Sequence, residues 1–191
     1  MKITDYKVIL ASNSPRRKEL LKGIDIDFEV KLLPNIDESY PESLRGDEIA
    51  EFVALKKATP YIPSLAANDL LITADTIVLL EGVVYGKPSN KEEAKEMLRT
   101  LSGKTHSVIS GVCLTSIDKQ ISFSATSEVE FAELTDSEIE YYVNHYSPFD
   151  KAGSYGVQEW IGYVAVKNIN GSYYNIMGLP IHRLYRELIQ F

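Results

Sequence analysis

The order of apolar and polar residues near the start of the chain predicts a strand followed directly by a helix. Residues 7–11 form a short, mostly apolar run, as expected of a buried strand. Ser14 is a favourable N-cap residue and Pro15 suits the first helical position, so we expect a helix to begin there and to stop at Gly23. The chain therefore turns from strand to helix within a few residues.

The same periodicities predict the remaining elements and the fold class. Helices are expected over 47–58, after a capping box at Ser89 and Glu92, after a second capping box at Thr135 and Glu138, and from Pro180 onwards. Strands are expected over 28–30, 70–80, 83–85, 107–115, 121–131 and 163–169, with a hairpin turn at Asn170-Gly171 and a return strand after it. Helices that alternate with strands, together with hairpins, predict a mixed-sheet α/β fold.

Length, charge and cysteine content restrict the class of protein further. At 191 residues we expect one domain over 1–191, with two lobes that share a sheet, and the formal charge of −7 argues against a nucleic-acid partner. No stretch suits a membrane span, and residues 1–14 lack the apolar centre of a signal peptide, so we expect a cytoplasmic protein without a membrane partner. Cys113 is the only cysteine, which excludes an intramolecular disulfide and indicates an inert core thiol.

The strand-to-helix corner at residues 12–17 is the first candidate site. The first turn of a helix leaves backbone N–H groups without partners, and the helix dipole adds positive potential there. Ser12 and Ser14 add hydroxyl groups, and Arg16 and Arg17 add two guanidinium groups that fit phosphate oxygens. The corner therefore predicts an anion site. The alternative is a capped surface helix with two solvated arginines.

Asp75, followed by Thr76, is the second candidate, because it interrupts an otherwise largely apolar strand. An ionised carboxylate is costly to bury unless it is paired, hydrogen-bonded or bound to a cation. It could act as a general base on water or as a ligand to a hard divalent cation. The alternative is a structural acceptor for backbone amides.

Two lysines and one glutamate complete the set of candidate charges. Lys57 extends the apolar face of the helix at 47–58, and Lys87 lies between Gly86 and Pro88. The alternative for Lys57 is a side chain that extends along the apolar face and places its charge in solvent. The alternative for Lys87 is an ordinary surface lysine. The four cations Arg16, Arg17, Lys57 and Lys87 would neutralise the negative charge of a phosphate chain. The acids Asp75 and Glu38 would suit a Mg²⁺ ion bound with it.

Six short motifs occur in a fixed order over nearly the whole chain. They are Ser12-Asn13-Ser14-Pro15-Arg16-Arg17, Ala74-Asp75-Thr76, Gly86-Lys87-Pro88, Leu101-Ser102-Gly103-Lys104-Thr105-His106, Lys151-Ala152-Gly153-Ser154-Tyr155-Gly156-Val157-Gln158, and Gly171-Ser172-Tyr173 with Gly178-Leu179-Pro180. Together they resemble the Maf family of nucleoside triphosphate pyrophosphatases. The resemblance implies a two-lobed α/β fold with a central cleft, like that of inosine triphosphate pyrophosphatases.

The resemblance also implies an activity and a role for each candidate residue. The subgroup that this chain resembles hydrolyses dTTP, UTP and modified pyrimidine nucleotides to the monophosphate and diphosphate, and needs a divalent metal, Mg²⁺ or Mn²⁺. A sister subgroup that prefers 7-methyl-GTP usually has Gln in place of Thr76. The implied roles are proton acceptor for Asp75, substrate choice for Arg16, Thr76 and Gln158, triphosphate contacts for Ser12, Arg17, Lys57 and Lys87, and metal ligation for Glu38 and Asp75. Glu159-Trp160 departs from the Gly-rich pair that is common after Gln158.

Two other functions stay open from the sequence. The family is associated with septum formation and cell division arrest, so one alternative is a nucleotide-binding regulator with little turnover. The other is an enzyme that removes deaminated purine nucleotides such as ITP and XTP. In both the main interpretation and the second alternative, the enzyme would keep non-standard nucleotides out of nucleic acids. Members of the family are often homodimers, which we expect here too.

Overall fold

The computed structural model describes residues 5–191, and residues 1–4, which belong to the amino-terminal stretch considered above, lie outside the described part. The chain divides into two compact units. Unit 1 comprises the residues up to Thr76, Ser110–Ala125 and Gly178–Phe191, and unit 2 comprises Ile77–Ile109 and Thr126–Met177. No helix within residues 5–191 is long and apolar enough to cross a membrane.

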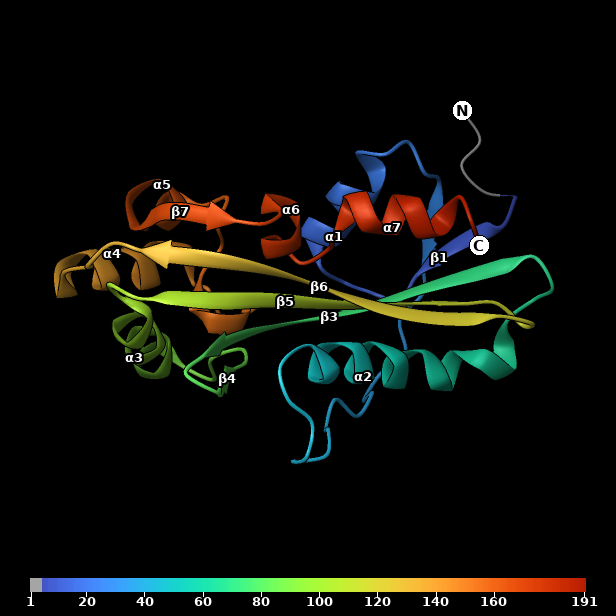
Figure 1. Cartoon of the computed structure of the whole chain (residues 1–191), viewed down its shortest axis with the longest axis horizontal. Helices are drawn as coiled ribbons and strands as arrows, with labels where there is room; N and C mark the ends of the chain where they lie inside the picture. The colour runs from blue at the N-terminus through green and yellow to red at the C-terminus, as the bar shows by residue number, and fades with distance from the viewer. Residues whose placement is uncertain (1–4) are drawn as a thin grey trace. The chain divides into compact units, whose positions relative to one another are not determined.

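A seven-stranded mixed sheet is the main feature of the fold (Figure 1). Its strands are β1 (Lys7–Leu10), β2 (Phe28–Val30), β3 (Asp69–Leu80), β4 (Val83–Tyr85), β5 (Thr105–Thr115), β6 (Gln120–Phe131) and β7 (Val166–Asn170). The order is β2-β1-β3-β5-β6-β7, with β4 paired to β3. β1 runs parallel to β2 and β3, whereas β4 is antiparallel to β3 and β7 is antiparallel to β6. The predicted mixed-sheet α/β fold is confirmed, and the central cleft stays a prediction.

In unit 1, helices cover both faces of the strands (Figure 1). Helix α2 (Asp47–Ala58) lies on one face, and α1 (Pro15–Lys22) and α7 (Ile181–Leu188) lie on the other, while the 3₁₀ helix η1 (Thr59–Ser64) continues α2. Gly111 of β5 allows α2 to approach closely, because a Cβ there would lie 2.1 Å from the Ala50 carbonyl oxygen. The first turn of α2, which contains Ala50, can thereby lie close against the sheet.

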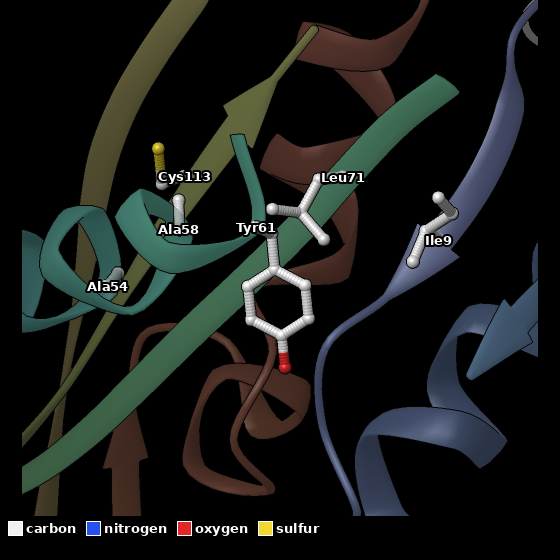
Figure 2. Close-up of a cluster of buried hydrophobic side chains, with 6 residues drawn as sticks. All are labelled: Ile9, Ala54, Ala58, Tyr61, Leu71 and Cys113. Carbon is white, nitrogen blue, oxygen red and sulfur yellow. The ribbon is translucent and has the colours of Figure 1, made fainter. Parts of the chain in front are cut away.

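A buried hydrophobic cluster fills the space between α2, the following η1 and the strands of the sheet (Figure 2). It consists of Ile9, Ala54, Ala58, Tyr61, Leu71 and Cys113. Small alanines on the helix leave room for the branched side chains of β1 and β3. Burial raises the pKa of the Cys113 thiol, as expected of the predicted core thiol.

Unit 2 contains the remaining helices, of which α3 (Lys91–Leu101) and α4 (Asp136–Tyr146) are the longest. The others are η2 (Ala152–Ser154), α5 (Trp160–Ala165) and α6 (Tyr173–Ile176). The predicted capping box of Thr135 and Glu138 is present at the start of α4. The one predicted at Ser89 and Glu92 is wrong by one residue, because the Asn90 side chain caps α3 by accepting from the Glu93 N–H.

The predicted strand over 163–169 and its return strand are also wrong in part. Residues 160–165 form α5, and only the following residues form β7, which pairs with β6 rather than with a later strand. Beyond Gly171 the chain forms α6 and not a strand. Ser127 of β6 holds the residue before this helix, because its hydroxyl accepts from the Ser172 N–H and donates to the Ser172 carbonyl. The C-terminal helix begins with Pro180 as its N-cap, as predicted.

His106 in the core of unit 2 makes this unit sensitive to acid. Its side chain is buried between Phe131 and Tyr155 and is hydrogen-bonded to the Tyr155 hydroxyl at 2.8 Å. Burial lowers the pKa of His106 from 6.5 to about 4. The unfolded chain therefore binds a proton that the folded chain does not, so the free energy of unfolding falls as the pH drops from 6.5 towards 4, by up to about 3 kcal/mol.

We expect His106→Gln to remove part of this pH dependence, because Gln keeps a hydrogen-bonding side chain but does not titrate. Urea unfolding at pH 7 and pH 5 measures the loss of stability in each protein. The exposed residue His182 provides the control, and His182→Gln should lose as much stability between the two pH values as the wild type does. Equal losses in the wild type and His106→Gln would contradict the assignment.

Candidate active site

The strand-to-helix corner in unit 1 has the predicted local structure. Strand β1 ends at Leu10, and α1 begins at Pro15 with Ser14 as its N-cap, whose side chain accepts from the Arg17 N–H at 3.4 Å. The hydroxyl of the buried residue Ser12 accepts from the Ser14 N–H at 3.3 Å. The hydroxyls of Ser12 and Ser14 thus order the loop that leads to the positive end of the helix.

The guanidinium group of Arg17 points into the protein. Its Nε donates to the Gly178 carbonyl at 2.8 Å, and its Nη1 donates to the Ala74 carbonyl at 2.9 Å and to Ser12 Oγ at 3.4 Å. Its Nη2 donates to Thr76 Oγ1 at 3.1 Å. Burial lowers the pKa of Arg17. Because Ala74 and Thr76 flank Asp75, this arginine holds the strand on both sides of the carboxylate, and the alternative of a solvated side chain is wrong for Arg17.

We expect Arg17→Lys to lower stability although the charge is kept. An ammonium group cannot reproduce the planar fork, so the Ala74 and Gly178 carbonyls would lose their donors. The expected loss is about 2 kcal/mol, as for buried acceptors left without partners. Thermal and urea unfolding measure it, with Arg99→Lys on the surface of unit 2 as the control, and a loss no larger than in that control would contradict the role given to Arg17.

Asp75 lies beside Lys57, whose positive charge offsets the cost of burying the Asp75 carboxylate. Lys57 Nζ is 2.7 Å from Asp75 Oδ1, and both side chains are largely buried, at 12% and 15% exposed. The same ammonium is 3.1 Å from Glu38 Oε1. Asp75 is therefore a paired acid and not an uncompensated one, and Lys57 does not simply extend into solvent. The ammonium group lies within ion-pair distance of both carboxylates that were predicted to bind a metal.

A second lysine anchors the loop that carries Glu38. Lys56, next to Lys57 at the end of α2, is 2.6 Å from Asp37 Oδ2 and also donates to the hydroxyl and the carbonyl of Ser39. Hydrogen bonds from Lys56 and Ser39 lower the pKa of Asp37 to about 2. Sequence reasoning missed this anchor, although two adjacent lysines facing the adjacent acids Asp37 and Glu38 offered a signal.

The hydroxyl group of Thr76 is also part of this hydrogen-bond network. It accepts from Arg17 and lies 2.8 Å from Ser110 Oγ and 3.4 Å from the Gly178 carbonyl. Gly178 belongs to the sixth sequence motif, but neither it nor Ser110 was predicted to contact Thr76, because both are far from Thr76 in the sequence. Arg16 is half-buried next to Arg17.

Lys87 and Gln158 belong to unit 2. Lys87 is exposed, and the preceding carbonyl of Gly86 accepts from the Gly153 N–H at 3.0 Å. Gln158 follows the loop at 155–157, and its Oε1 atom is buried without a hydrogen-bond partner among the described residues. A buried acceptor without a partner is unusual in a folded protein and fits a position that meets a ligand donor.

The described residues contain no group of three or more His, Cys, Asp or Glu side chains that could hold a metal ion. Mg²⁺ commonly uses only one or two carboxylates together with phosphate oxygens of the substrate. Asp75 and Glu38 fit that donor set, because both carboxylates lie against one cation, Lys57.

The protein is thus a mixed-sheet α/β protein in which Arg17, at the start of α1, holds the strand that carries Asp75, and Asp75 is paired with Lys57. The chain matches the family model described as "Maf-like protein" over residues 7–191, and it therefore belongs to that family. The family resemblance is thus confirmed.

Two named relatives are similar to the chain over nearly its whole length, and a solved structure shares its fold. A Phocaeicola vulgatus protein named dTTP/UTP pyrophosphatase is 60% identical over 183 residues, covering 96% of this chain and 95% of that protein. A Porphyromonas gingivalis protein of the same name is 53% identical over 188 residues, covering 97% and 94%. A HAM1 protein from Coxiella burnetii has a TM-score of 0.53 at 17% identity, covering 97% of this chain and 100% of that one, and shares the fold.

Proposed function

We propose that this protein is a nucleoside triphosphate pyrophosphatase that hydrolyses dTTP and UTP to the monophosphate and diphosphate. The observation that carries the proposal is the cluster in unit 1, where Asp75 is paired with Lys57 and held on both sides by Arg17. The names of the Phocaeicola vulgatus and Porphyromonas gingivalis relatives support the pyrimidine substrates.

In the proposed reaction, Asp75 is the general base. A water molecule attacks the α-phosphorus, its proton passes to the Asp75 carboxylate, and the bond from the α-phosphorus to the bridging oxygen breaks as diphosphate leaves. Positioned carboxylates serve this role in many hydrolases. The strand is held by Arg17, so the carboxylate would meet the water with little reorganisation.

The proposed triphosphate contacts are Ser12, Arg17, Lys57 and Lys87. Within residues 5–191, four of the five N–H groups of Arg17 donate to protein acceptors. The fifth N–H group would then donate to a phosphate oxygen of the substrate. A polyphosphate would also compete with Asp75 and Glu38 for the Lys57 ammonium, which would then neutralise the substrate instead.

Asp75 and Glu38 are the proposed ligands of a divalent cation, Mg²⁺ or Mn²⁺. When bound, such an ion polarises phosphoryl oxygens and balances the charge of the leaving diphosphate. The two carboxylates would supply hard oxygen donors once the lysine turns to the phosphates. Assays with each metal alone decide which one is used.

Substrate choice is proposed to depend on Arg16, Thr76 and Gln158. Thr76 is tied to Arg17 and Ser110, and a Gln at this position would not present the same hydroxyl. The Oε1 atom of Gln158 has no hydrogen-bond partner among the described residues, and it would accept from the N–H of a uracil or thymine ring.

A screen of sixteen nucleoside triphosphates tests the proposal, with phosphate detected by malachite green with and without added inorganic pyrophosphatase. We expect signal from dTTP and UTP, and only when pyrophosphatase is present, because the product is diphosphate. Signal from ITP and XTP alone would favour the purine alternative, and binding without release from any nucleotide would favour a regulator of septum formation.

We further propose a cytoplasmic homodimer that acts on free nucleotides and has no nucleic-acid or membrane partner. The acidic net charge of −7 supports the absence of a nucleic-acid partner. Light scattering on the purified chain measures the oligomeric state.

A further inference from the structure

A buried ionic network in unit 2 surrounds the loop that carries Gln158. The carboxylate of Glu159 lies 3.1 Å from the Nζ atom of the buried residue Lys151, and it accepts a hydrogen bond from the hydroxyl of Tyr142, which is fully buried on α4. The same hydroxyl accepts from the Gly156 N–H at 3.0 Å. Burial and the Glu159 carboxylate raise the pKa of Tyr142, which therefore stays protonated and donates.

Gly156 brings Glu159 and Gln158 to the same point. A Cβ on Gly156 would lie 2.9 Å from Glu159 Cδ, 3.0 Å from Glu159 Oε2 and 3.0 Å from Gln158 Nε2. The carboxylate and the amide nitrogen thus lie on the same side of Gly156, at the place that a side chain on this residue would occupy. The Glu159 N–H donates to the Gly156 carbonyl at 2.9 Å and closes the turn.

The Glu159 carboxylate favours one of the two orientations of the Gln158 amide and so determines which end of that amide points away from Glu159. The positive NH₂ end of Gln158 is favoured near the negative Glu159 oxygens, and the Oε1 end is repelled by them. In the structure, Gln158 Nε2 and Glu159 Oε2 each lie 3.0 Å from the position that a Cβ on Gly156 would take, and Gln158 Oε1 is buried without a hydrogen-bond partner among residues 5–191. The free end of the side chain is therefore an acceptor.

We propose that Glu159 is a positioning residue that fixes the Gln158 amide with its oxygen towards the base, so that the site accepts the ring N–H of thymine or uracil and disfavours cytosine. This inference rests on the proposed function. Cytosine carries an acceptor where thymine and uracil carry that N–H group, so an acceptor on the protein would face an acceptor on the ring. The penalty for such a mismatch is the basis of the selectivity.

Glu159→Gln tests the inference, because it keeps the shape of the side chain but removes the charge that orients the amide. Asp150→Asn is the matched control, since Asp150 is the other carboxylate of Lys151, at 2.7 Å, and the substitution changes the charge equally. Initial rates with dTTP and dCTP give the ratio of kcat/KM values for each variant. Trp160, the only tryptophan, directly follows Glu159 and gives a second measurement that needs no turnover, namely fluorescence titration with dTMP and dCMP.

We expect Glu159→Gln to lower the preference for thymine over cytosine about tenfold, in keeping with one oriented hydrogen bond, mainly through KM and with kcat close to wild type. Asp150→Asn should keep the wild-type preference. If Glu159→Gln does not fold, Glu159→Asp, which withdraws the charge by one methylene, should lower the preference in the same direction.

The outcomes separate the two proposals. A wild-type preference that is unchanged in the Glu159 variant, in rates or in binding, overturns the positioning role while the pyrophosphatase activity stands. A wild-type protein that releases no diphosphate rejects the proposed function, and the fluorescence ratio then still decides the role of Glu159. Equal loss of preference in Asp150→Asn would show a general structural effect and would also overturn the inference. Absence of both turnover and binding in the wild type would reject both.

Discussion

Replacing Asp75 by Asn is expected to lower the turnover of dTTP at least about a hundredfold, the range found when a general base is removed. Asn has nearly the same shape but cannot take a proton from water at neutral pH. The neighbouring contacts stay available, because Arg17 binds the Ala74 carbonyl and the Thr76 hydroxyl and not the Asp75 side chain. The change should therefore appear in kcat, measured as diphosphate release at saturating nucleotide.

The control for this substitution is Asp136→Asn, which removes a carboxylate from a surface pair with Arg99 in unit 2. Exposed pairs of this kind contribute little, so the control should keep full activity. Circular dichroism and thermal unfolding establish that both variants are folded. Diphosphate release at the wild-type rate by folded Asp75→Asn protein would reject Asp75 as the proton acceptor.

Lys57→Met is expected to reduce kcat/KM for dTTP about a hundredfold, as found when a preorganised charge-stabilising group is removed. Met has a similar length but no charge, so Asp75 and Glu38 would lose the ammonium that lies against both of them. The variant would also lack one of the cations proposed to bind the triphosphate. Initial rates over a range of dTTP concentrations measure the effect.

The adjacent residue offers a matched control for Lys57. Lys56→Met makes the same chemical change one position earlier on α2, but its partner Asp37 is exposed, at 67% of its side-chain surface. We expect Lys56→Met to cost less than about threefold in kcat/KM, since exposed ion pairs are weak. Similar losses in the two variants would mean that removal of charge from this helix end, and not the contact with Asp75, explains the effect.

Local signals in the sequence predicted most of the elements near the site. The Ser14-Pro15 pair predicted the start of α1, and the apolar periodicity predicted α2 over its observed range. The prediction of a strand around residue 163 was wrong because the β-branched and aromatic residues there favour a strand, whereas tertiary packing favours α5. Gly162 contacts the backbone so closely that a Cβ would lie 1.8 Å from the Val157 carbonyl oxygen, and no local propensity reports such a contact.

The candidate site was predictable as a set of charges but not as a set of pairs. Periodicity placed Lys57 on the apolar face of α2 and Asp75 inside a strand, yet it contains no information about which charge meets which. Arg17 shows the same limit, because its acceptors Ala74 and Gly178 lie 57 and 161 positions away along the chain. Only the fold brings these positions together.

The bond between Arg17 and the Gly178 carbonyl has a consequence for synthesis of the protein. Helix α1 is synthesised early, but one acceptor of its Arg17 side chain is Gly178, in the segment Gly178–Phe191 of unit 1. A nascent chain still short of that segment has the arginine but not this acceptor, so the hydrogen bonds of the corner are completed only after Gly178 has been made. A chain that stops before Gly178 would therefore lack one of the bonds that hold Arg17 in place.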